Sequence, residues 1–212
     1  MAEAFLFDYW RSSASYRVRI ALNLAGIETE SVSVDLVKQD QRSPEHLARN
    51  PQGFVPVLEI DGHSFTQSLA ILDYLDETRA LGLLPQDPAE RAKLRALGHS
   101  VAVDVHPVCN LQVVAHVAQL LPDVQTAKQD WMQRFIGPGL QAFEQLLAGF
   151  EQSPFCSGET PGFADICLMP QIYNAERWGA SYDDCPRIQS VVAACAAHPA
   201  FVAAHPDQVK PN

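Results

Sequence analysis

The sequence predicts a mixed α/β fold over residues 1–84 and an all-helical fold over residues 85–212. Up to Leu84, strand-like alternation and helical periodicity follow one another in the order strand, helix, strand, helix, strand, strand, helix. After a short linker over 82–87, the strand patterns stop and the apolar spacing is helical. A length of 212 residues suits one globular domain or two small ones.

The elements of the α/β part follow from periodicity and from turn residues. Val18, Leu22 and Ala25 share one face of the first helix, and a glycine follows as its stop. The dipeptide Asp61-Gly62 predicts a hairpin turn between two strands. The seven elements are expected at 5–9, 17–25, 32–36, 45–48, 55–60, 63–65 and 67–79.

The helical part has clear start signals and prolines inside its periodic segments. Asp87 can cap the first helix, Pro88 suits its first position, and Glu90 completes a capping box. Pro107 is expected to kink this helix, and Gly137-Pro138-Gly139 to kink or break the next. Helices are expected at 88–121, at 126–150 with a capping box at its start, at 163–178, at 186–197 and as a last turn at 200–205.

The net charge and the hydropathy of the chain argue against some classes of binding partner. The chain has 25 Asp and Glu residues against 15 Lys and Arg residues, a formal net charge of -10. Such a balance argues against a nucleic-acid surface or an anionic membrane as a partner. No segment approaches the ~20 apolar residues of a membrane span, and no secretory signal is recognised. A cytoplasmic location is therefore expected.

Cysteine and histidine usage predicts no cross-links and no metal site. The five cysteines are scattered, odd in number and without a C-x-x-C pair, so neither a disulfide framework nor a zinc site is expected. They are expected to be buried, reduced thiols. The seven histidines lack ligand spacing, and we expect no metal.

A serine-bearing turn at the start of the first helix is the main candidate site. Residues 10–20 read Trp-Arg-Ser-Ser-Ala-Ser-Tyr-Arg-Val-Arg-Ile, between an apolar strand and a helix. The exposed N–H groups and partial positive charge of a helix start favour an anion or a thiolate. The alternative is that Ser12, Ser13 and Ser15 only cap the helix.

Two dipeptides of the α/β part also have both a functional and a structural interpretation. Pro56 cannot donate to a sheet, and a cis bond after Val55 would let the Val55 backbone pair with an extended peptide. The alternative is an ordinary edge-strand proline. Ser68, after Gln67 at a helix start, can hold a carboxylate or simply cap that helix.

These motifs resemble the zeta class of cytosolic glutathione transferases, the maleylacetoacetate and maleylpyruvate isomerases. Residues 12–22 are similar to the class signature S-S-C-x-x-R-V-R-I-A-L, and the Asn174 to Arg177 segment also discriminates the class. Val55-Pro56 and Gln67-Ser68 mark only the superfamily. The resemblance covers essentially the whole chain. It implies a thioredoxin-like domain followed by a helical bundle, with glutathione as the cofactor.

The resemblance also implies roles for individual residues. The glutathione thiol would lie at Ser12, with Ser13 as the alternative stabiliser of the thiolate. The remaining contacts to glutathione would come from Gln41, Val55, Pro56, Gln67, Ser68, His106 and Asn110. Arg11 and Arg177 would grip the carboxylates of the substrate, and His106 would bind glutathione or stabilise an enolate. A homodimer is expected from the family.

Two departures from the family pattern affect the expected chemistry and the expected stability, respectively. Ala14 replaces the signature cysteine, so the sulfur must come from glutathione and a glutaredoxin-like disulfide mechanism is not expected. Gly162 replaces the usual Ser or Thr cap three residues before Asp165, at a cost of a few tenths of a kcal/mol.

The implied reaction is cis–trans isomerisation of maleylacetoacetate or maleylpyruvate, in the breakdown of aromatic compounds. Thiolate addition, bond rotation and elimination would return glutathione unchanged. One alternative is a glutathione transferase acting on small electrophiles such as α-haloacids, which the same thiolate serves. A second is a catalytically silent transferase-like binding protein. Such a protein would be expected to lack the thiol-activating serine, whereas this chain has Ser12 and Ser13.

Overall fold

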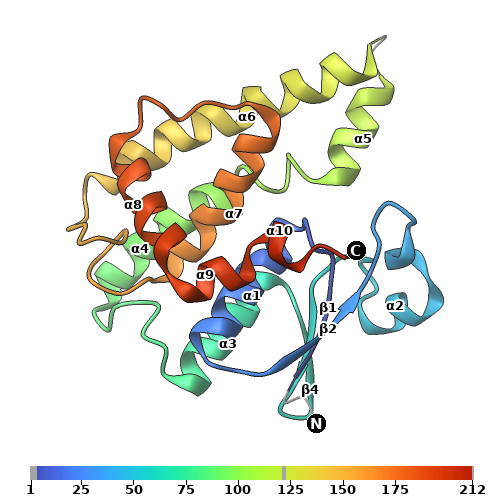
Figure 1. Ribbon diagram of the computed structural model, residues 1–212, viewed down its shortest axis with the longest axis horizontal. Helices are drawn as coiled ribbons and strands as arrows, with labels where there is room; N and C mark the ends of the chain where they lie inside the picture. Colours follow the sequence, from blue (N-terminus) through green and yellow to red (C-terminus); the bar gives the residue numbers. More distant parts are fainter. Residues whose placement is uncertain (1–3, 121–122, 212) are drawn as a thin grey trace. The chain divides into compact units, whose positions relative to one another are not determined.

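The computed structural model describes residues 4–120 and 123–211, which form two compact units (Figure 1). Unit 1 comprises the chain up to Gly82 together with the segment from His198, and unit 2 comprises Leu83–Ala197. The first boundary lies two residues before the expected one at 84. The C-terminal segment differs from the expectation, because it belongs to the α/β unit rather than to the helical one.

Unit 1 contains a four-stranded sheet in the order β2-β1-β3-β4. Strand β1 pairs in parallel with β2 and antiparallel with β3, which forms the expected hairpin with β4 around Asp61 and Gly62. Helices α1 and α3 lie on one face of this sheet (Figure 1). The elements are β1 Ala4–Asp8, α1 Ser13–Leu24, β2 Thr29–Ser33, α2 Pro44–Arg49, β3 Val57–Ile60, β4 His63–Thr66, α3 Ser68–Arg79, α9 Pro199–Ala204 and α10 Pro206–Val209, with a 3-10 turn at Asp40–Arg42.

The C-terminal segment joins unit 1 because α9 packs against α1. Arg19 Nε donates to the Ala204 carbonyl at 3.1 Å, and Asn23 Nδ2 donates to the Ala200 carbonyl at 2.9 Å. The periodicity of a terminal helix indicates that it has a buried face. It does not indicate which distant helix covers that face, and here the partner lies about 180 residues earlier in the chain.

Two element boundaries in unit 1 differ from the expected ones. Helix α1 begins at Ser13, four residues before the expected start, so the serines lie in its first turn. Strand β2 ends at Ser33, before the alternating Val34 and Leu36. Val34 is nevertheless buried, and both residues belong to an apolar cluster that includes Tyr9 and Val55. The alternation of Val34 and Leu36 therefore reflects the burial of their side chains in this cluster, beyond the end of the strand.

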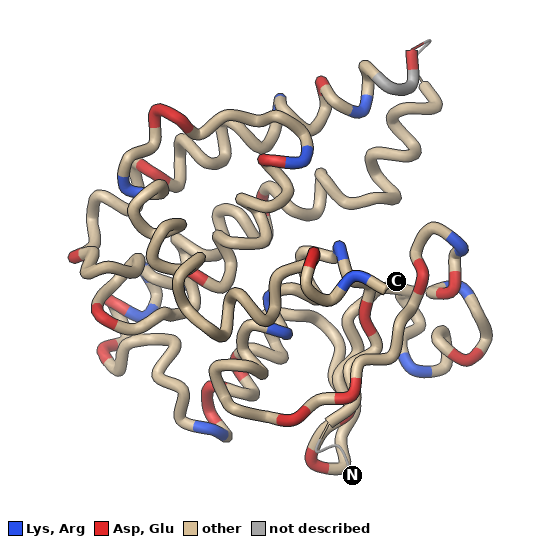
Figure 2. Tube along the Cα trace, viewed as in Figure 1, with Lys and Arg blue, Asp and Glu red and all other residues tan. Residues whose placement is uncertain are grey.

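Unit 2 consists of helices around a buried central one, as expected for residues 163–178. Helix α7 packs closely on α4, where a Cβ at Gly98 would lie 2.7 Å from the Phe163 ring. The helices are α4 Pro88–Ala102, α5 Leu111–Gln119, α6 Val124–Leu147, α7 Phe163–Trp178 and α8 Pro186–Ala197. Within the two described stretches, no helix has the length and apolarity needed to cross a bilayer. Basic and acidic positions are interspersed along the trace (Figure 2).

The helix expected over 88–121 is two helices, so the predicted kink at Pro107 is wrong. Helix α4 ends at Ala102, and α5 begins at Leu111 with Asn110 accepting a bond from the Val113 amide at 3.0 Å. A proline disfavours helical backbone in the residue before it, and a capping side chain can then start a new helix. The expected end of the helix at Leu121 lies outside the described residues.

The expected interruption at 137–139 is also absent, since α6 runs continuously through Pro138. Gly139 has a packing role instead, because a Cβ there would lie 2.4 Å from the Val105 side chain. The start of the helix differs as well. Asp123 accepts bonds from the backbone and hydroxyl of Thr126, so the capping residue is Asp123. Gly139 therefore allows two chain segments to approach each other closely. The periodicity of the sequence does not distinguish such a glycine from one that ends a helix.

Candidate active site

The turn between β1 and α1 places a serine hydroxyl at the helix N-terminus. Ser12 is the N-cap residue, and its Oγ accepts a bond from the Ser15 amide at 3.2 Å. The Ser12 amide donates to the Tyr9 carbonyl at 2.8 Å, which closes the turn. Of the three serines, Ser12 makes the side-chain capping bond, and this capping role does not exclude a site. A hydroxyl accepts with a lone pair, so its single proton remains able to donate elsewhere.

Charged and aromatic side chains surround this turn. The Arg11 guanidinium donates to the Tyr9 hydroxyl at 3.1 Å and lies 5.0 Å from the centroid of the Trp10 ring. Lys210, near the C-terminus, lies 5.4 Å from the same ring. The first turn of α1 contains no acidic residue. The surroundings of Ser12 are therefore electropositive in a chain of strongly acidic composition.

The start of α3 forms a second polar site in unit 1. Ser68 is 5% exposed, and its Oγ accepts a 2.8 Å bond from the buried guanidinium of Arg17. Gln67 makes no capping bond and has positive φ (67°), and its side-chain amide donates to Gln52 at 2.9 Å. A helix N-terminus with a buried cation beside it suits a carboxylate.

Val55, Pro56 and Gln41 also lie in unit 1. The Val55-Pro56 peptide bond is cis. Val55 is in the apolar cluster that contains Tyr9, so the Val-Pro dipeptide and the serine turn share one core. Gln41 is 7% exposed, and its Oε1 has no hydrogen-bond partner among the described residues. A buried acceptor without a partner is costly unless a water or a ligand donates to it.

The three candidate residues of unit 2 have distinct local environments. His106 is half-buried in the turn segment after α4, and its amide donates to the Val101 carbonyl at 3.0 Å. Asn110 caps α5, a structural role that the sequence did not predict. Arg177 is exposed in the last turn of α7, with its guanidinium 5.6 Å from the Trp178 ring.

Comparison with known proteins identifies the family. The profile for the N-terminal domain of glutathione S-transferases matches residues 2–77. Maleylacetoacetate isomerase of Rhizobium meliloti is 56% identical over 99% of both chains, and the Rattus norvegicus enzyme of that name is 41% identical over 95% of this chain and 91% of its own. The chain belongs to the maleylacetoacetate isomerase family.

Solved structures agree with this family assignment. A bacterial maleylpyruvate isomerase described as a zeta-class glutathione S-transferase superposes with a TM-score of 0.94, at 34% identity over 98% of this chain and 99% of its own. The maleylacetoacetate isomerase of Methylobacterium extorquens, solved with malonate and glutathione, has a TM-score of 0.90 at 38% identity over 98% of each chain. This family member is thus a glutathione-dependent isomerase of the zeta class.

This protein has no cysteine in its serine turn, and the cysteines that it has elsewhere are poorly reactive because they are buried. Ala14 occupies the second position of α1, and all five cysteines are buried and free. Burial raises the pKa of Cys109 to about 12 and raises that of Cys156 well above its usual range. A neutral thiol is a weak nucleophile. No cluster able to hold a metal ion occurs within residues 4–120 and 123–211.

The Gly162 departure has a local explanation. The Asp165 carboxylate accepts bonds from the amides of Gly162 (2.8 Å) and Cys156 (2.9 Å), which caps α7. A Cβ at Gly162 would lie 3.0 Å from the Leu83 carbonyl oxygen, which accepts the Phe163 amide. Desolvation raises the pKa of Asp165. The glycine thus allows the chain from Leu83 to pass close to the helix start.

Arg17 and Arg19 are two arginines of α1 for which the sequence favours structural or interface roles. The structure places the Arg17 guanidinium on Ser68, inside the candidate site. Arg19 donates to the carbonyl of Trp10, in the serine turn. Both arginines are at least nine-tenths buried. The available signal was an R-V-R triplet within an otherwise apolar helix, since arginine is rarely buried unless it is paired.

Proposed function

We propose that this chain isomerises a small cis-alkene dicarboxylate, maleylacetoacetate or maleylpyruvate, and that Ser12 stabilises the glutathione thiolate. The observation that carries this proposal is the geometry of Ser12, whose lone pair caps α1 while its proton stays available. When bound, glutathione supplies a sulfur that adds reversibly to the double bond and leaves a single bond able to rotate. The chain's own residues must bind, ionise and orient it.

The polar groups of unit 1 fit the three ends of glutathione. Ser68, supported by the Arg17 cation, and Gln67 would receive the γ-glutamyl carboxylate at the start of α3. The Val55 backbone would pair with the central cysteine. The unpartnered Gln41 Oε1 would accept an N–H from the glycine end. These roles rest on the resemblance together with the local environments described above.

We assign substrate recognition to Arg11 and Arg177, because a guanidinium can bind a carboxylate through two hydrogen bonds. Arg11 is adjacent to Ser12 in the turn, and Arg177 is exposed on α7. Two relatives were solved with carboxylate ligands, one with malonate and one with citrate and dicarboxyethyl glutathione. His106 would bind glutathione or donate to the enolate oxygen, and Asn110 would contact glutathione beyond its capping role.

A spectroscopic assay with both substrates tests the proposal. The protein should isomerise at least one of the two only when glutathione is present, without net consumption of glutathione. Consumption of glutathione with an α-haloacid and no isomerisation would favour the transferase alternative. Retention on glutathione resin without either activity would favour a silent binding protein.

The substrate assignment has its own test in Arg177→Ala. The variant should lose turnover, with a higher KM for the dicarboxylate, while its affinity for glutathione stays the same. Arg187→Ala, which removes a half-exposed arginine from α8, is the matched control and should retain full activity. Full isomerase activity in Arg177→Ala would refute the substrate-binding role.

Two further features of the proposal concern assembly and location. We propose that the chain forms a homodimer in the cytoplasm, as the family resemblance implies. Sedimentation equilibrium should give about twice the mass of one chain, and a monomer at micromolar concentration would contradict the assignment.

A further inference from the structure

Arg19 connects three separate segments of unit 1 through one buried side chain. Its Nη1 donates to the Asp8 carboxylate at the end of β1, and its Nη2 donates to the Trp10 carbonyl at 2.9 Å. Its Nε donates to the Ala204 carbonyl at the end of α9, at 3.1 Å. Arg19 is 7% exposed and Asp8 4% exposed, so these bonds are shielded from water. Each partner takes a different nitrogen of the planar guanidinium.

The partners of Arg19 are themselves fixed. The second oxygen of Asp8 accepts a bond from the Ser31 hydroxyl at 2.9 Å, which ties the ion pair to β2. The guanidinium lies 5.6 Å from the Tyr16 ring centroid, and the His205 ring meets the same tyrosine edge-on. The C-terminal segment therefore packs against the helix that carries the serine turn.

We propose that Arg19 is a positioning residue for thiolate formation, by which the C-terminal segment holds the serine turn in place. The Trp10 carbonyl belongs to the peptide that leads through Arg11 to Ser12. Two hydrogen bonds reach the backbone of this turn: the Arg19 side chain, from α1, donates to the Trp10 carbonyl, and the Ser12 amide donates to the Tyr9 carbonyl. A displacement of about 1 Å is enough to weaken a hydrogen bond aimed at a reacting atom.

The geometry requires arginine rather than any cation. A lysine could keep the ion pair with Asp8, but its single ammonium cannot also reach carbonyls on two other segments with the spacing of a guanidinium fork. Arg19→Lys therefore keeps the buried charge balance and removes the connection to Trp10 and Ala204. We expect the ordinary stability role of the ion pair to survive in this variant, and the positioning role to be lost.

The inference rests on the proposed function, since it concerns the ionisation of glutathione at Ser12. The measurement is the ultraviolet absorbance of the thiolate in the binary complex with glutathione, followed against pH without any isomerase substrate. In Arg19→Lys we expect the pKa of bound glutathione to rise by about one unit, which lowers the thiolate fraction and kcat/KM about tenfold at pH values below both pKa values.

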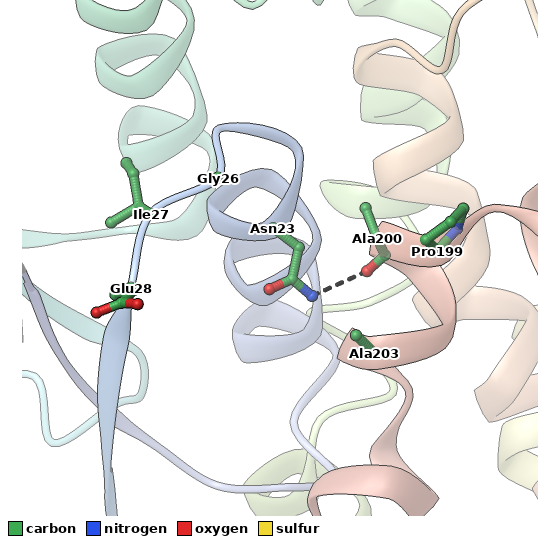
Figure 3. A pocket seen from close by; sticks show the side chains of 7 residues that line it. All are labelled: Asn23, Gly26, Ile27, Glu28, Pro199, Ala200 and Ala203. Atoms are coloured by element: carbon green, nitrogen blue, oxygen red, sulfur yellow. Dashed lines mark hydrogen bonds between the residues drawn. The ribbon is translucent and has the colours of Figure 1, made fainter.

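Asn23→Ala supplies a matched control in the same pair of helices. Asn23 also joins α1 to α9, through the Ala200 carbonyl at 2.9 Å beside a surface pocket of about 280 Å³ (Figure 3), but it lies at the opposite end of α1 from Ser12. The variant should lower the melting temperature without changing the pKa of bound glutathione. An equal pKa in wild type and Arg19→Lys, or an equal shift in Asn23→Ala, would overturn the proposal.

A second variant keeps the test decisive if Arg19→Lys does not fold. Ser31→Ala removes only the bond that fixes the far oxygen of Asp8, and no buried charge. It should shift the pKa of bound glutathione upward by a smaller amount, and an unchanged pKa would contradict the proposal. If wild-type protein shows no thiolate band with glutathione, the proposed role of Ser12 fails instead, so the two failures are distinguishable.

Discussion

The serine turn and the helical unit differ in their cysteine content and in the thiol chemistry that they favour. All five cysteines lie between residues 109 and 195, in unit 2, and each is buried and free. The turn at Ser12 contains no cysteine, yet it has the hydroxyl, the helix N-terminus and the nearby cations that favour a thiolate. The region that we propose to activate a thiol therefore contains no cysteine, and the region that contains the cysteines buries all of them.

Because of this difference, the reactive sulfur must come from the bound cofactor. A cysteine beside Ser12 would be a second nucleophile that competes with glutathione for the substrate. Burial of the five cysteines blocks access to their thiols, and desolvation raises the pKa values of Cys109, Cys156, Cys185 and Cys195. Reactive sulfur is then present only while glutathione is bound.

The largest expected effect is the protection of the five native cysteines from a thiol reagent. In folded protein we expect labelling by iodoacetamide to be at least about a thousandfold slower than in urea, because it requires opening of the core. Mass spectrometry after timed quenching measures the labelled fraction. A cysteine that reacts rapidly in the native state would remove the contrast between the two regions.

The variant Ser12→Ala tests whether the serine turn stabilises a thiolate. Loss of the hydroxyl should lower kcat/KM about a hundredfold, the usual effect of removing a donor to a developing anion. It should also shift the acid limb of the pH–rate profile to higher pH, since thiolate then forms at higher pH. Ser13→Ala is the matched control. A larger effect in Ser13→Ala would transfer the role to that residue.

Much of the fold, and the burial of the cysteines, could be predicted from the sequence. The expected α/β order, the hairpin at Asp61-Gly62 and the buried helix over 163–178 are all confirmed. These features depend on local patterns of apolar, glycine and capping residues. The burial of the cysteines was also predicted, because scattered cysteines without metal spacing are usually core residues.

The wrong predictions concern contacts between distant segments. Gly137-Pro138-Gly139 was expected to kink or break a helix, but α6 runs through it and Gly139 makes room for Val105. The structural or interface roles expected for Arg17 and Arg19 named no partners, and their partners Ser68 and Ala204 lie 51 and 185 residues away in sequence. A sequence pattern indicates that a side chain needs a partner, and only the fold identifies that partner.

Ala14→Cys would sharpen the comparison by adding a thiol to the serine turn. A cysteine in the first turn of a helix has a lowered pKa, whereas one at the C-terminal end does not. Ala25, which is also half-buried, lies at the other end of α1 and gives the matched control Ala25→Cys. We expect Ala14→Cys to react with iodoacetamide about tenfold faster than Ala25→Cys near pH 7. Equal rates would argue against activation by the turn.

The smallest expected effect is the alkaline instability caused by a buried thiol. Burial raises the pKa of Cys195, so the native state retains a proton that the unfolded chain releases above its thiol pKa of about 8.5. The unfolded state then binds fewer protons, and the free energy of unfolding falls as pH rises through that value. At about pH 9 the loss is roughly 0.8 kcal/mol for one thiol. Urea titrations of wild type and Cys195→Ala near pH 7 and pH 9 measure it. The wild type should lose more stability over this interval than the variant by that amount, and an equal loss would mean that Cys195 ionises as freely as an exposed thiol.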